Sequence, residues 1–105
     1  MIAFLSLCQL KPEVTPDLFE DLMSRTRVQL LRIPEILAVK TGKRVNPNDE
    51  WPWFVYLETE SMDKLAIAQD DPNYIKFREE VLRPHVAETT SVAFEMEPRK
   101  DVKYS

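Results

Sequence analysis

The hydrophobic residues of this chain follow a strand-like period in four short segments. The apolar run from Ile2 to Leu10 ends at Lys11-Pro12, as is typical of a strand followed by a turn. The other three segments are rich in β-branched or aromatic residues and lie close to turn-forming residues. Gly42, the only glycine, falls inside one of them and predicts a bulge or a close backbone approach. We predict strands over residues 2–10, 36–45, 51–60 and 89–97.

A helix is predicted between the first two strands. Thr15 is a suitable N-cap, Pro16 fits the first helical position, and Asp17 lies near the positive end of the helix dipole. Pro34 is expected to end this helix. Hydrophobic residues recur at spacings of three and four, so one face must pack on another element. That face consists of Leu18, Phe19, Leu22, Met23, Thr26, Leu30 and Ile33.

A second helical region is predicted between the third and fourth strands. Ser61 caps a short helix that runs through Gln69, and Asp71-Pro72 starts a new one. We therefore expect a kink or break near Asp70-Asp71. Arg83-Pro84 is expected to end this region.

The order of elements predicts one α+β domain with the sequence strand–helix–strand–strand–helix–strand. At 105 residues the chain has the size of a single domain with one hydrophobic core. We assign residues 1–98 to this domain and residues 99–105 to a polar C-terminal tail.

Both faces of the predicted sheet are apolar, which predicts a partner. Ala3, Leu5 and Leu7 alternate with the face that carries Phe4. Two helices cover only one face of a four-stranded sheet, so the other face needs separate cover. We expect a two-fold homodimer through Ala3, Leu5 and Leu7, with cover by the tail or a distorted loop as the alternative. Trp51 and Trp53, at the start of the third strand, are expected at the rim of this dimer.

Composition and charge narrow the class of protein. A hydrophobic fraction of 44% and a charged fraction of 30% are typical of a globular domain. The formal net charge of -4 and scattered basic residues argue against a nucleic-acid partner. The apolar start lacks the features of a signal peptide, and no membrane association is expected. Cys8 is the only cysteine, so we expect a cytoplasmic protein without an intramolecular disulfide.

Few residues offer chemistry. His85 is the only histidine, and with Tyr74 it is the candidate catalytic residue; capping the helix C-terminus is the favoured alternative for His85. For Tyr74 the alternative is a structural role in the core. Cys8 has no base or positive neighbour nearby in sequence, so packing as a small apolar residue is favoured over a nucleophilic role. We expect neither a metal nor a cofactor, since no histidine or cysteine cluster offers ligands.

The chain resembles the stress-responsive α/β-barrel family, also called dimeric α/β-barrel (Dabb) domains. The resemblance spans nearly the whole chain through Pro98 and depends on the order of several short motifs. These are the segment 10–15 (LKPEVT), Ile33-Pro34, the segment 39–43 (VKTGK), Phe77 with the segment 81–84 (VLRP), and Phe94-Glu95.

This resemblance implies a ferredoxin-like βαββαβ protomer with a four-stranded antiparallel sheet, which pairs with a second copy to form a dimeric α/β-barrel. It also implies a cleft between sheet and helices that binds a small apolar or aromatic molecule. The cleft residues would be Phe4, Ser6, Cys8, Met23, Tyr74 and Phe77.

The family is mostly of unknown function, although a plant member cyclises a polyketide using histidines. Two of those histidine positions fall here on Phe4 and Tyr74, which argues against the same chemistry, because a phenol is a poor base at neutral pH. Three functions remain open. They are a homodimer that binds a small molecule, a cofactor-independent cyclase-like or monooxygenase-like enzyme that uses Tyr74 and His85, and a structural or regulatory dimer without a ligand.

Overall fold

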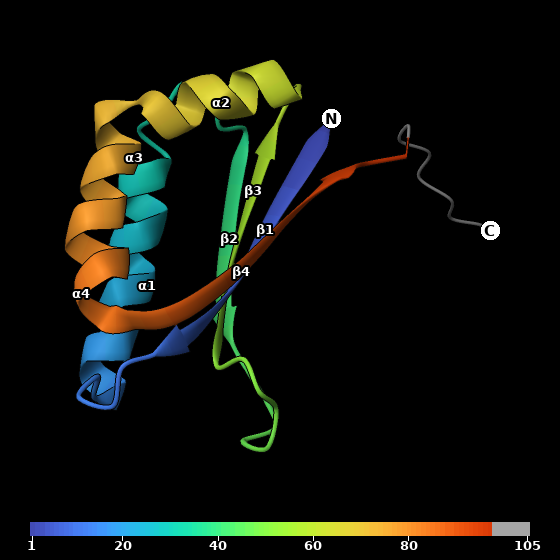
Figure 1. The fold of residues 1–105 in the computed structure, drawn as a ribbon. Coiled ribbons are helices and arrows are strands. Elements are labelled where there is room, and N and C mark those ends of the chain that lie inside the picture. The colour runs from blue at the N-terminus through green and yellow to red at the C-terminus, as the bar shows by residue number, and fades with distance from the viewer. Residues whose placement is uncertain (98–105) are drawn as a thin grey trace.

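The protein has a ferredoxin-like α+β fold, in which helices cover one face of an antiparallel sheet (Figure 1). The computed structural model describes residues 1–97; the predicted tail, residues 99–105, and Pro98 lie outside this range. Within residues 1–97 the sheet has four strands in the order β2-β3-β1-β4. The elements are β1 (Ile2–Leu10), α1 (Pro16–Leu30), β2 (Ala38–Lys43), β3 (Trp53–Thr59), α2 (Met62–Asp70), α3 (Pro72–Phe77), the π-helix η1 (Arg78–Leu82), α4 (Arg83–His85) and β4 (Val86–Glu95).

Side-chain caps start the helices where the sequence predicts them. The hydroxyl of Thr15 accepts a hydrogen bond from the backbone N–H of Leu18 at 3.2 Å, and the hydroxyl of Ser61 caps α2. The Asp71 carboxylate accepts from the backbone N–H of Asn73 at 2.8 Å and so starts α3. The predicted break near Asp70-Asp71 is confirmed, since α2 ends at Asp70.

Several predicted boundaries were wrong by a few residues. Helix α1 ends at Leu30 rather than at Pro34, and Ile33 follows in a turn but is still buried. Strand β4 begins at Val86 rather than at Thr89, because β1 and β4 continue to pair through a register shift at Gln9 and Leu10. Strands β2 and β3 are shorter than predicted at both ends.

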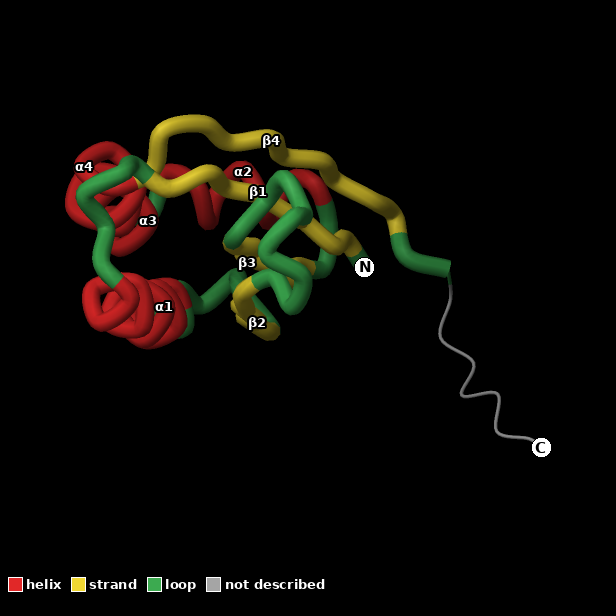
Figure 2. The backbone as a smooth tube through the Cα atoms, turned by 90° about the horizontal axis from the view of Figure 1, so that it is seen from below, coloured by secondary structure: helices red, strands yellow, loops and turns green. Residues whose placement is uncertain are grey.

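The core lies between the helices and the face of the sheet that carries Phe4 and Cys8. Cys8 pairs with Trp53, and Ser6 with Val55, so these side chains share the helix-facing side. Figure 2 places α1, α3 and α4 in one layer beside the strands. The predicted orientation of β1 is thus confirmed. The largest fully buried side chains are Cys8, Leu22, Thr26, Leu30, Ile33, Trp53, Leu57 and Thr59.

Trp53 belongs to this core, so its predicted place at a dimer rim was wrong. Only 1% of the residue is exposed, and its ring packs edge-to-face on Phe19 with 5.9 Å between ring centroids. Its indole Nε1–H donates to the hydroxyl of Thr41 at 2.6 Å, which satisfies its one polar group. Residues 53, 55, 57 and 59 of β3 all face the helices, and this alternation carries Trp53 inward.

The opposite face of the sheet is apolar at its centre. Leu5 lies between Tyr56 and Val92 of the neighbouring strands, and Leu7 lies beside Phe54. Val92 and Phe94 are about half exposed, at 45% and 53%. Ala3 lies on the same face between Glu58 and Phe94 and is buried within the protomer. We call this surface the outer face; its apolar members are Ala3, Leu5, Leu7, Phe54, Tyr56, Val92 and Phe94.

Gly42 allows an aromatic ring to lie flat on strand β2. A Cβ atom at this position would lie 2.7 Å from Cε2 of Phe54, the cross-strand neighbour on the outer face. The prediction of a close approach at Gly42 is confirmed. The approaching group is a side chain, so a larger residue at position 42 would displace the Phe54 ring from the outer face.

Two further features were not predicted. The chain from Pro72 onward passes through a π-helical turn, η1, in which the backbone N–H of Arg83 bonds to the carbonyl of Arg78 five residues before. This turn carries the chain into the short helix α4 and then directly into β4.

In the described part of the chain, no helix combines the length and apolar character that a membrane crossing requires.

Candidate functional site

An apolar cavity lies between the sheet and the helices, beneath α3 and η1. Its volume is about 20 Å³, which is close to the space that one water molecule needs. Four of the predicted cleft residues, Ser6, Cys8, Tyr74 and Phe77, line it together. The remaining lining residues are Leu30, Val55, Leu57 and Leu82. We call this space the inner cavity; side chains nearly fill it.

The other predicted site residues lie elsewhere. Phe4 and Met23 are partly buried and pack against the core, but neither lines the inner cavity. Met23 instead borders a shallow groove between α1 and β2. His85 lies at the end of α4, where its Nδ1 is 3.1 Å from the carbonyl oxygen of Val81. This contact matches the capping alternative for His85, because the ring satisfies a carbonyl that the helix end leaves free.

The phenol of Tyr74 is better suited to hydrogen-bond donation than to proton abstraction. Burial raises the pKa of its phenol, an effect that the nearby Gln69 side chain and the Arg78 charge oppose. Its ring packs edge-to-face on Phe77 and lies 5.6 Å from the guanidinium carbon of Arg78. A phenol that stays protonated at neutral pH can donate to a ligand carbonyl, whereas it cannot remove a proton from a substrate.

Cys8 is held as a neutral thiol. The residue is fully buried, and burial raises its pKa from 9.0 to about 11, while the neighbouring Thr89 side chain acts in the opposite direction. A nucleophilic cysteine needs a thiolate, which a positive neighbour or a base normally stabilises. Cys8 therefore fits the role of a small packed residue, as the sequence favoured.

The raised pKa of Cys8 predicts a loss of stability at high pH. The folded state binds the thiol proton more tightly than the unfolded state does. The contribution of the thiol to the free energy of unfolding is therefore complete below pH 9 and is lost as the pH rises toward 11. The rise in the pKa from 9.0 to about 11 corresponds to roughly 2–3 kcal/mol in the free energy of unfolding. Urea unfolding at pH 7 and pH 10.5 should show that the free energy of unfolding falls more for the wild type than for Cys8→Ala. Equal losses in the two proteins would mean that the thiol does not contribute.

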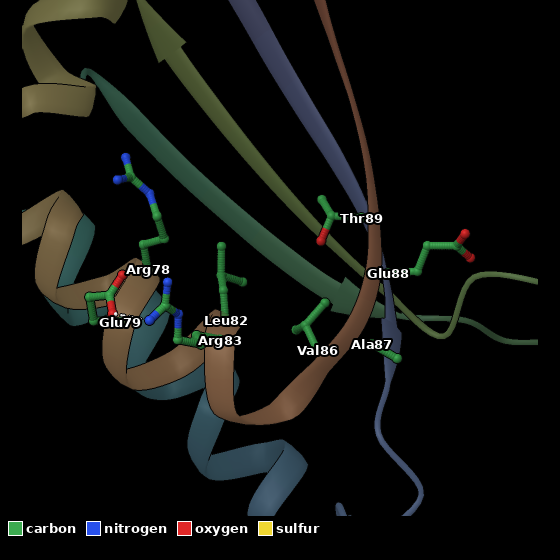
Figure 3. A pocket seen from close by; sticks show the side chains of 8 residues that line it. All are labelled: Arg78, Glu79, Leu82, Arg83, Val86, Ala87, Glu88 and Thr89. Carbon is green, nitrogen blue, oxygen red and sulfur yellow. Dashed lines mark ion pairs between the residues drawn. The ribbon is translucent and has the colours of Figure 1, made fainter.

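An open groove adjoins the inner cavity on its β4 side. It has a volume of about 370 Å³ and separates η1 and α4 from the first half of β4 (Figure 3). Leu82 lines both spaces, so they lie next to each other. We call this space the outer groove; its lining residues are Arg78, Glu79, Leu82, Arg83, Val86, Ala87, Glu88 and Thr89.

The outer groove was not predictable from the sequence pattern alone. Two arginines flank Leu82 in the sequence, but the predicted start of β4 at Thr89 left residues 86–88 in a loop. The predicted elements therefore lacked the part of β4 that forms one wall of the groove. Prediction of the groove would have required a strand β4 that begins at Val86, because this longer strand brings Val86 and Thr89 opposite Leu82. Within residues 1–97, no three histidine, cysteine, aspartate or glutamate side chains gather in a way that suits a metal ion.

Known structures share this architecture. The structure of a Dabb family protein from Mesorhizobium loti matches with a TM-score of 0.80 at 12% identity, over 91% of this chain and 96% of that chain. This chain shares the ferredoxin-like fold of that protein. No protein-family model matches the sequence, and no curated protein is similar to it. The ferredoxin-like fold that the resemblance implied is therefore confirmed.

Two other structures show that proteins of different descriptions share this fold. A dimeric ferredoxin-like protein of unknown function from Thermobifida fusca matches with a TM-score of 0.81 at 21% identity, over 90% of each chain. A hydroxynitrile lyase from Passiflora edulis matches with a TM-score of 0.81 at 12% identity, over 94% of this chain and 95% of that chain. Identities this low establish the fold and leave the activity open.

Proposed function

We propose that this protein is a homodimer in which two copies pair through the outer face. The observation that carries this proposal is the apolar centre of that face, where Leu5 and Leu7 lie among aromatic and β-branched neighbours. Lys40 and Glu58 lie toward one edge, so the apolar centre has a polar border there, as interfaces usually do. A two-fold axis brings one patch onto its own copy, and an apolar patch complements itself. A structural neighbour that is described as dimeric supports this assembly.

Each protomer of this dimer binds a small apolar or aromatic molecule on the helix side of its sheet. The inner cavity supplies apolar walls and one buried phenol donor, Tyr74, which is the usual make-up of a small-molecule site. The cavity itself is too small for such a molecule, so Leu82 must move and join it to the outer groove. The cytoplasm is the compartment we expect, since a single buried cysteine suits reducing conditions.

Binding to the inner cavity is tested with a neutral aromatic probe, 2-naphthamide. Its addition should shift the NMR signals of the Tyr74 and Phe77 rings. Ser6→Leu fills the cavity and should weaken binding by about tenfold or more, because the added side chain occupies the space of the ligand. Ser91→Ala is the matched control. It removes the 2.8 Å hydrogen bond between the hydroxyls of Ser6 and Ser91 without filling the cavity, so binding should persist.

Two results would refute this function. One is the absence of shifts at Tyr74 and Phe77 at saturating probe, and the other is unchanged binding by a Ser6→Leu variant that still folds. Circular dichroism establishes that each variant is folded.

Catalysis is a second candidate, favoured by the protonated phenol of Tyr74 inside the cavity. Tyr74 would act there as a hydrogen-bond donor to a substrate carbonyl or hydroxyl. The residues that line the inner cavity include no carboxylate and no histidine, so the chemistry would need a base from the substrate or from solvent. His85 is placed for capping, so its predicted catalytic role has no support from this contact.

A further inference from the structure

The outer groove carries an unbalanced positive charge beside its apolar floor. Arg83 forms an ion pair with Glu79 at 3.3 Å, so these two charges offset each other. Glu88 extends from β4 away from the space between the strand and the helices (Figure 3). Arg78 lines the groove as well, and within residues 1–97 it has no carboxylate at ion-pair distance. Arg78 is therefore the charge that a ligand in this groove would meet.

The position of Arg78 links the groove with the inner cavity. Its guanidinium lies over the ring of Tyr74, a lining residue of the inner cavity, while the arginine itself lines the outer groove. It also donates a long hydrogen bond, 3.4 Å, to the carbonyl of Gln69. These contacts orient the exposed guanidinium over the ring of Tyr74.

Leu82 lies where the two spaces adjoin. It lines both, it is only partly buried, and it lies on the π-helical turn with Arg78. Val86 and Thr89 point toward it from β4, across the groove (Figure 3). We infer that a displacement of the Leu82 side chain would open the groove toward the cavity. π-Helical turns of this kind are often found at functional sites.

We propose that the ligand is a small carboxylic acid with an apolar or aromatic body. Its carboxylate binds the guanidinium of Arg78, which favours two parallel hydrogen bonds to a carboxylate. The apolar body passes Leu82 and enters the inner cavity beside Tyr74 and Phe77. The groove opens on the helix side of the sheet, so pairing through the outer face leaves it accessible. This inference rests on the proposed function, because it gives the ligand class for the same site.

The test compares 2-naphthoate with the neutral 2-naphthamide, which has the same ring system. Calorimetry on the intact wild-type dimer should give an affinity for 2-naphthoate that is about tenfold higher than the affinity for 2-naphthamide. Arg78→Gln should abolish this preference, and Arg78→Lys should retain part of it. The double variant Glu79→Gln, Arg83→Gln removes the neighbouring ion pair without changing the net charge, so the preference should persist. Leu82→Ala should tighten the binding of both probes.

The outcomes separate this inference from the proposed function. Equal affinities for the two probes in wild type would leave small-molecule binding intact and refute the carboxylate preference. A preference that survives in Arg78→Gln, or is lost in the double variant, would overturn the assignment to Arg78. If neither probe binds wild type or Leu82→Ala, the proposed binding function fails and this inference fails with it.

Discussion

Leu7→Glu is expected to break the homodimer into monomers, or to unfold the chain if a protomer is unstable alone. Leu7 lies at the centre of the outer face, with Phe54 and Thr90 as its cross-strand neighbours. A glutamate there would place one unpaired carboxylate from each copy inside the interface, at a cost of several kcal/mol. The dimer dissociation constant should rise by about a thousandfold or more. Sedimentation velocity across a concentration series measures this change.

Val28→Glu is the matched control for Leu7→Glu. Val28 is 50% exposed on α1, on the helix side of the sheet, so the substitution introduces the same charge away from the outer face. This variant should sediment as the wild type does. If Leu7→Glu stays dimeric and equally stable, or if Val28→Glu dissociates to the same extent, the outer face is not the dimer interface.

Trp53→Ala should destabilise the protein more than other single core truncations. The indole is fully buried, packs on Phe19 and donates its N–H to Thr41, so truncation leaves a large cavity and removes that hydrogen bond. Removal of a buried tryptophan typically costs about 3–5 kcal/mol, a large part of the stability of a domain this size. Urea unfolding monitored by circular dichroism should show a clearly lower midpoint, or a chain that is unfolded without urea.

Trp51→Ala serves as the comparison, because the two tryptophans lie two residues apart in the sequence. Trp51 lies just before β3 and is partly exposed, so its truncation should cost about 1 kcal/mol or less. Thr41→Val removes the acceptor of the indole N–H together with the hydrogen bond from the Thr41 hydroxyl to the carbonyl of Phe54. It should cost about 1–3 kcal/mol. Similar losses for Trp51→Ala and Trp53→Ala would contradict the burial described above.

Local signals in the sequence were sufficient to predict most of the fold. Thr15, Ser61 and Asp71 each carry a side chain that caps the helix after it, so those starts were predictable from residue type alone. Strict alternation on β1 separated Phe4 and Cys8 from Leu5 and Leu7, and the strand pairing keeps that separation. Trp53 was misplaced because aromatic size was given more weight than its position in the alternating pattern.

The candidate site was less predictable because it depends on how distant segments meet. Ser6, Cys8, Tyr74 and Phe77 were predicted together through a family resemblance, and the fold does bring them together. The outer groove needs both the π-helical turn at Arg78–Leu82 and the early start of β4 at Val86. Neither has a local sequence signature, since the first depends on packing and the second on pairing with Leu10 across a register shift.

The mass of the wild-type protein in solution tests the central claim, pairing through the outer face, most directly. Light scattering coupled to size exclusion at micromolar concentration should give twice the chain mass of 12.3 kDa. The same mass should persist on dilution until the protein concentration approaches the dissociation constant of the dimer. A particle of 12.3 kDa throughout the micromolar range would contradict the claim, because the exposed Val92 and Phe94 would then have no partner copy to cover them.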